Sequence, residues 1–151
     1  GGEEWFRRTI FVFVADHVSS EKFAEQTRSY PGNMHILGFI YTPDGALQGE
    51  VTGITQQLDL MPTLLGIVGN REPYFAFGRD VLNESDRPQW SVSYDGEFRA
   101  LTDEGIVRLD DSGAGPTQQP TPAADTLAMR FRALLQQYYE HIENKNYTVH
   151  D

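Results

Sequence analysis

The sequence predicts an α/β fold, and three segments lead to this prediction. Residues 9–15 form an unbroken apolar run rich in β-branched and aromatic side chains, which is typical of a buried strand. Residues 90–109 contain short segments separated by glycine-containing turns, which predict an antiparallel meander. Residues 123–144 repeat apolar side chains at helical spacing. We therefore expect strands and helices in a chain of 151 residues, the length of one domain or of a part of a larger one.

The first expected strand ends at two good metal ligands, Asp16 and His17. Binding sites in open α/β sheets form outside the carboxyl ends of strands, so the pair is in a favourable place for a ligand. A carboxylate oxygen beside an imidazole nitrogen suits Zn²⁺ or Mn²⁺. The alternative is an ordinary solvated strand end that binds no metal.

A polar loop and a second strand are expected next. Residues 18–33 are polar and turn-rich, with a short helix expected around residues 21–27. Residues 37–42 read as a strand, which is stopped by a Pro-Asp-Gly turn. An α/β sheet that is cut at its first strand should expose apolar surface, and we expect neighbouring strands or a second copy of the chain to cover it.

A helix is expected to begin at Asp59. Asp is a favoured N-cap residue, and Pro62 then falls in the first turn, where its missing amide would have no partner anyway. Gly69 or Asn70 suits the C-terminal cap. We interpret Asp59 as a capping residue rather than as a catalytic carboxylate.

The meander is expected to contain three strands. Residues 90–94 alternate apolar and polar side chains, and Asp95-Gly96 is a strong hairpin turn. The return strand would cover residues 98–101 and the third strand residues 106–109.

An exposed linker and a long amphipathic helix are expected to complete the chain. Residues 112–122 are rich in Gly, Pro, Thr and Gln, as linkers are. Thr121 would cap the helix, Pro122 suits its first position, and the helix would end near Asn144. His141 lies near this end, and we assign it no site role. We expect an apolar stripe to pack the helix on the meander; it consists of Leu127, Phe131, Leu134, Leu135, Tyr138 and Ile142.

Composition excludes several classes of function. The formal net charge of −10 argues against nucleic acid and anionic lipid as direct partners. The chain contains no cysteine, so it has no disulfide, no zinc–thiolate site and no cysteine nucleophile. It has no apolar run long enough to span a bilayer, and we expect a soluble piece.

Four motifs in a fixed order give the chain a family resemblance. They are Asp16-His17 after a strand, His35-Ile36-Leu37-Gly38, Asp59-Leu60-Met61-Pro62-Thr63, and Phe77-Gly78-Arg79-Asp80-Val81-Leu82. Over residues 9–109 this order resembles the C-terminal part of the sulfatase and phosphoglycerol transferase branch of the alkaline phosphatase superfamily. The nearest resemblance is to the lipoteichoic acid synthase-like membrane enzymes of bacteria. It implies an alkaline phosphatase-like sheet in residues 1–87, with the meander, linker and helix in residues 88–151.

The resemblance also implies a chemistry. Asp16 and His17 would be two ligands of a divalent metal, Mn²⁺ or Zn²⁺, with Ca²⁺ and Mg²⁺ as alternatives. His35 would bind the transferred group or the leaving oxygen of an anionic phosphate or sulfate ester; the alternative for His35 is a structural histidine. The chain departs from the family pattern at Val18, where many relatives have Gly, and at Leu37, where the commoner residue is Pro.

The family's hydroxyl nucleophile and its first metal-binding carboxylate precede the Asp-His pair, and this chain has no counterpart for them. We therefore expect a fragment that is inactive alone, whose main partner is a missing N-terminal part of the same polypeptide. The resemblance places the parent enzyme in the bacterial cell envelope, with an extracytoplasmic catalytic domain. The alternative is a non-catalytic binding or accessory domain that keeps the fold. Self-association through the exposed sheet edge is a further expectation.

Overall fold

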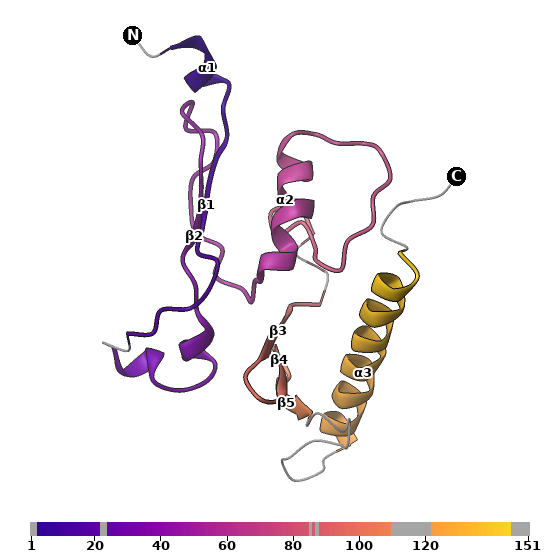
Figure 1. The fold of residues 1–151 in the computed structure, drawn as a ribbon. Helices are drawn as coiled ribbons and strands as arrows, with labels where there is room; N and C mark the ends of the chain where they lie inside the picture. Colours follow the sequence, from indigo (N-terminus) through magenta and orange to yellow (C-terminus); the bar gives the residue numbers. More distant parts are fainter. Residues whose placement is uncertain (1–2, 22–23, 85, 87, 110–121, 146–151) are drawn as a thin grey trace. The chain divides into compact units, whose positions relative to one another are not determined.

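The protein combines helices with two small antiparallel sheets, as the mixed α/β prediction requires (Figure 1). The computed structural model describes residues 3–21, 24–84, 86, 88–109 and 122–145. The chain divides into two compact units, Gly1–Glu50 and Val51–Asp151, and each is described by itself. The predicted domain boundary after residue 87 stays a prediction.

The first unit is built on a two-stranded antiparallel sheet. Its two strands are shorter than the two that were expected, and they confirm both. They pair with Phe11 opposite Tyr41 and Val14 opposite Gly38. A short helix was expected around residues 21–27, and the described residues of this segment form a 3-10 turn, η1. The elements of the unit are α1 (Glu4–Arg7), β1 (Phe11–Val14), η1 (Glu25–Thr27), η2 (Gly32–Met34) and β2 (Gly38–Tyr41).

Strand β1 is not the buried strand that its apolar sequence predicts. Phe13 of β1 and Phe39 of β2 stack with their ring centroids 4.6 Å apart, yet they are 49% and 48% exposed. A sheet of two strands gives each ring few neighbours, so stacking within the sheet covers only part of each ring. The apolar surface that was expected to be exposed is therefore observed.

The second unit contains a short helix that begins and ends at the predicted positions. The 3-10 turn η3 (Gln57–Asp59) leads into α2 (Leu60–Ile67). At the other end, Asn70 N donates to Leu65 O and Gly69 N donates to Gly66 O, with Gly69 at φ +70°. This is a Schellman cap, and it confirms the predicted C-terminal end of the helix.

The meander forms as predicted, from strands β3 (Trp90–Tyr94), β4 (Phe98–Thr102) and β5 (Gly105–Leu109). β4 is the central strand and pairs antiparallel with both neighbours. The two turns use Gly96 at φ +70° and Gly105 at φ +137°, a region that glycine enters at little cost.

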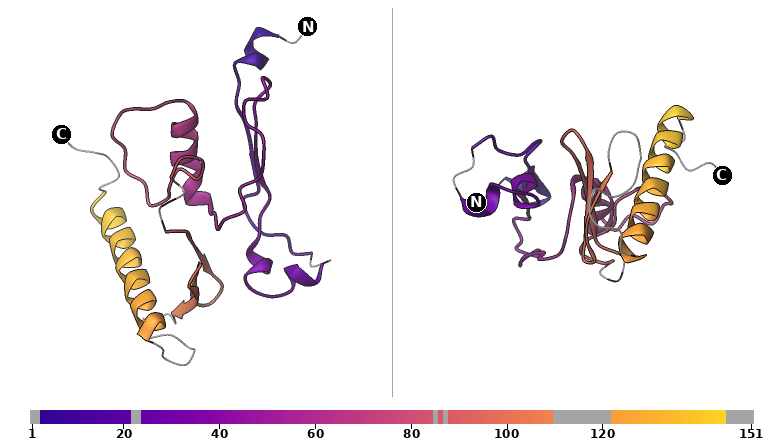
Figure 2. Two further views of the ribbon diagram at one scale, coloured as in Figure 1. Left: turned by 180° about the vertical axis from the view of Figure 1, so that it is seen from behind. Right: turned by 90° about the horizontal axis from the view of Figure 1, so that it is seen from below.

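Helix α3 (Pro122–Glu143) packs on the meander, which confirms the predicted partnership (Figures 1 and 2). Pro122 occupies its first position as predicted; Thr121 and the rest of the expected linker lie outside the described residues. The far end of the stripe contacts another segment, because the Tyr138 ring lies 5.7 Å from the ring of Phe77. The core between helix and sheet consists of Ala100, Val107, Leu109, Ala128 and Phe131.

In the part of the chain that the structure describes, no helix combines the length and the apolar character needed to cross a bilayer.

Candidate functional site

The pairing of β1 with β2 brings the predicted site residues to one end of the first sheet. Asp16 and His17 follow the last residue of β1, and the pairing continues past the strand ends because Ala15 N donates to Leu37 O at 2.9 Å. His35 lies just before β2. The antiparallel register therefore places all three residues at the same end of the first sheet. That His35 shares a site with Asp16 and His17 stays a prediction.

The side chains of Asp16 and His17 lie close together, and the imidazole ring also contacts the backbone. His17 Nδ1 lies 2.8 Å from Val18 O, and His17 Nε2 lies 3.7 Å from Asp16 Oδ1. If Nδ1 carries the proton and donates to the carbonyl, the lone pair is on Nε2, on the side of Asp16. Metal-binding histidines commonly hold their second ring nitrogen in this way. The side chains of His17 and Asp16 are 79% and 91% exposed, so a hydrated cation can reach both.

The same contacts alter the acidity of the imidazole. The hydrogen bond to Val18 O raises the pKa of His17 above its ordinary value, and the charge of Asp16 raises this pKa further. Protons therefore compete with a metal ion for Nε2 up to a higher pH than at an ordinary histidine.

The described residues do not supply a full set of ligands. Within them, no three His, Asp or Glu side chains gather closely enough to hold a metal ion. His35 is exposed, and its backbone N donates to Gly32 O at 3.2 Å. Since a zinc site normally uses three or four protein ligands, Asp16 and His17 fit a metal only as part of a larger set.

A second group of polar residues is buried in the second unit, and Asp59 is at its centre. Asp59 is 5% exposed, and its Oδ2 accepts the Gln56 backbone amide at 3.0 Å. Its Oδ1 accepts the backbone amide of Arg79 at 2.9 Å. The side chain makes no capping hydrogen bond to α2, so the predicted cap of that helix is wrong in its detail. Asp59 instead links the segment before the helix, at Gln56, to the segment after it, at Arg79. These bonds support the predicted structural role.

The neighbours of Asp59 also have internal partners. Thr63 Oγ1 accepts Val81 N at 3.1 Å, and Asp80 Oδ2 accepts Asn83 Nδ2 at 2.7 Å. The guanidinium of Arg79 donates to two backbone carbonyls, at Ile54 and Glu84. These hydrogen bonds satisfy buried polar groups, so we assign the network to the stability of the fold.

The network around Arg79 and Asp80 was not predicted from the sequence, although both residues belong to the motif at residues 77–82. A signal for it lies at Gly66, where a Cβ atom would overlap Asp80 Oδ2. A glycine inside a helix is unfavourable, so its presence in α2 indicates close approach of another group.

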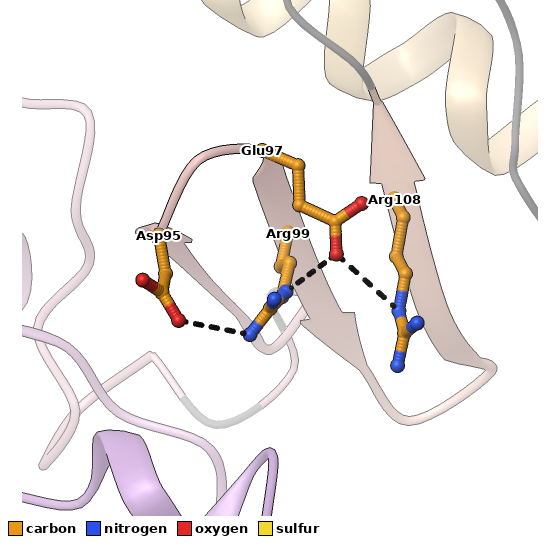
Figure 3. Close-up of polar contacts among 4 residues, drawn as sticks. All are labelled: Asp95, Glu97, Arg99 and Arg108. Carbon is orange, nitrogen blue, oxygen red and sulfur yellow. Dashed lines mark hydrogen bonds and ion pairs between the residues drawn. The ribbon is translucent and has the colours of Figure 1, made fainter.

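A third polar group lies on the meander, on the opposite side of the strands from the helix-facing Ala100 and Val107 (Figure 3). Arg99 Nε lies 2.8 Å from Glu97 Oε1, and Arg99 Nη1 lies 3.7 Å from Asp95 Oδ2. The same Glu97 oxygen lies 3.9 Å from Arg108 Nε. Two carboxylates therefore balance two guanidinium groups, and the group has no excess charge with which to attract an ion.

Comparison of the chain with protein-family models, with curated proteins and with solved structures finds no match.

Proposed function

We propose that the chain is part of a metal-dependent enzyme that acts on phosphate or sulfate esters, a phosphoglycerol transferase or a sulfatase, and that Asp16 and His17 bind its divalent cation. The observation that carries the proposal is the arrangement of these two side chains. His17 Nδ1 is held by Val18 O, and Nε2 lies 3.7 Å from Asp16 Oδ1 at an exposed strand end. The sequence resemblance supplies the class of reaction.

A divalent cation, when bound, supplies positive charge that favours the ionised form of a hydroxyl nucleophile and polarises the oxygens of the transferred group. In this proposal the carboxylate of Asp16 and the neutral imidazole of His17 hold that charge. The Val18 carbonyl fixes the orientation and the tautomer of His17. His35, at the same end of the sheet, donates a hydrogen bond to an ester oxygen of the substrate.

The proposed enzyme needs more residues than this chain supplies. Covalent catalysis requires a nucleophile next to the metal, and the described residues hold only a partial set of metal ligands. We propose that the hydroxyl nucleophile and the further ligands belong to another part of the same polypeptide. In the same proposal the parent enzyme acts outside the cytoplasm, in the bacterial cell envelope.

A non-catalytic accessory domain is the second candidate. The high exposure of Asp16 and His17, together with the lack of a third ligand among the described residues, favours this alternative. The two proposals differ in whether the pair binds a metal ion at all.

Paramagnetic broadening by Mn²⁺ tests the proposal on the chain itself. NMR spectra of the histidine side chains should show strong broadening at His17, weaker broadening at His35 and none at His141, which lies in α3. Asp16→Asn should abolish selective broadening, whereas the exposed control Asp103→Asn should keep it. Equal broadening at His17 and His141, or selective broadening that survives Asp16→Asn, would contradict the metal assignment.

A further inference from the structure

The chain contains two Asp-Gly pairs, Asp44-Gly45 after β2 and Asp95-Gly96 between β3 and β4. Such a pair can rearrange without an enzyme, because the amide nitrogen of the glycine can attack the carboxyl carbon of the aspartate and close a five-membered ring. Glycine favours this step because it has no Cβ atom to hinder the approach. The two pairs are alike in sequence, so any difference in reactivity comes from their hydrogen bonds.

The pair at Asp44 is held at both reacting groups. Asp44 Oδ1 accepts the Ala46 backbone amide at 3.0 Å. The nitrogen that would attack, Gly45 N, donates to Thr42 O at 3.0 Å. A ring can close only when the attacking atom is free to approach its target, and here both hydrogen bonds would have to break first.

The same turn makes the carboxyl group of Asp44 less reactive. The hydrogen bond from Ala46 N lowers the pKa of Asp44, and the side chain of Thr42 lowers this pKa further. Ring closure expels water from the protonated carboxyl group, and a lower pKa leaves less of that form at neutral pH. The turn therefore protects Asp44 although its side chain is exposed.

The pair at Asp95 lacks these restraints. The Asp95 side chain is 64% exposed, and its Oδ2 lies 3.7 Å from Arg99 Nη1, which is longer than a hydrogen bond (Figure 3). Within the part of the chain that the structure describes, no backbone amide donates to this carboxylate and no carbonyl accepts the Gly96 amide. Both reacting groups are therefore available in the folded protein.

Rearrangement at Asp95 would alter the first hairpin of the meander. The new linkage adds the Cβ atom of Asp95 to the main chain of the loop, next to the Tyr94–Phe98 pair at the end of the ladder. The remaining carboxylate is then bonded directly to Cα, so it is one bond shorter than the side chain that approaches Arg99. The loop lengthens and the Asp95–Arg99 ion pair is lost.

We propose that Asp95-Gly96 is a site of spontaneous isoaspartate formation and that the turn at Asp44-Gly45 is protected from it. Gly96 N forms a bond to Asp95 Cγ, and one carboxyl oxygen leaves as water. Water then attacks the former main-chain carbonyl carbon of Asp95, the bond from this carbon to Gly96 N breaks, and the nitrogen takes up the proton. The product has the mass of the original chain, and the reaction needs no cofactor and no oxidant. This inference stands apart from the proposed function.

Incubation of the 151-residue chain at neutral pH, followed by digestion with trypsin, tests the proposal. Cleavage after arginine separates the two pairs, because the first lies in the peptide of residues 29–71 and the second in that of residues 80–99. An isoaspartyl O-methyltransferase with radioactive S-adenosylmethionine labels the product. In the folded chain, residues 80–99 should gain several-fold more label than residues 29–71. In urea both peptides should gain label at similar rates, because the turn that protects Asp44 is lost.

Two matched variants locate the reaction. Asp95→Glu keeps the charge but would have to close a less favourable six-membered ring, so the label in residues 80–99 should disappear. Asp103→Glu, the same change at an exposed position in the next turn of the meander, should leave that label unchanged.

Three outcomes would overturn the proposal. Equal or greater label in residues 29–71 of the folded chain would contradict the protection of Asp44. Label in residues 80–99 that survives Asp95→Glu would place the reaction at another residue of that peptide. A folded chain that stays unlabelled, while the chain in urea is labelled, would show that the hairpin protects Asp95 as well.

Discussion

The carboxylate of Asp59 connects the start of α2 to Arg79, whose backbone amide lies 2.9 Å from Asp59 Oδ1, twenty residues further along the chain. The other oxygen accepts the Gln56 amide. One buried side chain therefore satisfies two backbone donors that are more than twenty residues apart in the sequence.

Asp59→Asn should destabilise the protein by about 1–3 kcal/mol, because one backbone amide would then face a side-chain donor instead of an acceptor. Urea denaturation followed by circular dichroism measures the change. The exposed Asp103→Asn is the matched control and should lie within about 0.5 kcal/mol of wild type. A loss no larger than that of the control would show that Asp59 has no structural role.

Gly66→Ala should also destabilise the protein, by about 1–3 kcal/mol, through overlap with Asp80. Alanine favours a helix by about 1 kcal/mol over glycine, so a helix without the close contact would be stabilised. The sign of the change in a thermal melt therefore separates the two cases, and a more stable variant would contradict the observed packing.

Phe131→Ala should cost about 3–5 kcal/mol, since Phe131 is 4% exposed in the core between α3 and the meander. Gln136→Ala, on the exposed side of the same helix, should cost little. Denaturation of both variants under identical conditions gives the comparison, and equal small effects would mean that α3 does not depend on this packing.

The pKa of His17, measured by an NMR titration, should exceed 6.5. Asp16→Asn should lower it only in part, because the Val18 carbonyl is the larger cause of the increase. The metal binds the neutral imidazole, so metal affinity should fall as the pH decreases through this pKa. A titration midpoint at or below the ordinary histidine value would remove the basis for this pH dependence.

The chain alone should not turn over aryl phosphate or aryl sulfate esters in the presence of Mn²⁺ or Zn²⁺. In the proposed function the nucleophile belongs to another part of the polypeptide, and two ligands hold the metal weakly. Turnover that disappears in Asp16→Asn would show that the chain holds a complete active site.

The sequence predicted the elements whose signals are local. Asp95-Gly96 marked the first hairpin of the meander, and Gly69 marked the end of α2. The apolar spacing around Phe131 identified α3 and its packed face. Each of these signals depends on residues within one or two turns of chain, where backbone preference and periodicity decide the structure.

Contacts between residues that are distant in the sequence could not be predicted in the same way. The hydrogen bond from Arg79 to Asp59 depends on how the intervening loop returns, which no local pattern specifies. Burial of β1 was overestimated for a related reason, because an apolar run shows what a strand would prefer to contact, not how many neighbours it has. The strand ends that carry Asp16, His17 and His35 follow from local signals, whereas the role of these residues in a site stays a prediction.

Each of the two units contains one tryptophan, whose fluorescence can report the unfolding of that unit. The chain has two tryptophans; Trp5 lies in α1 of the first unit and Trp90 in β3 of the second. Trp5 is 61% exposed, while Trp90 is partly buried in the meander. In Trp90→Phe the remaining fluorescence reports the first unit alone, and in Trp5→Phe it reports the second. Denaturation curves of these two variants would therefore show whether the units unfold together or one before the other.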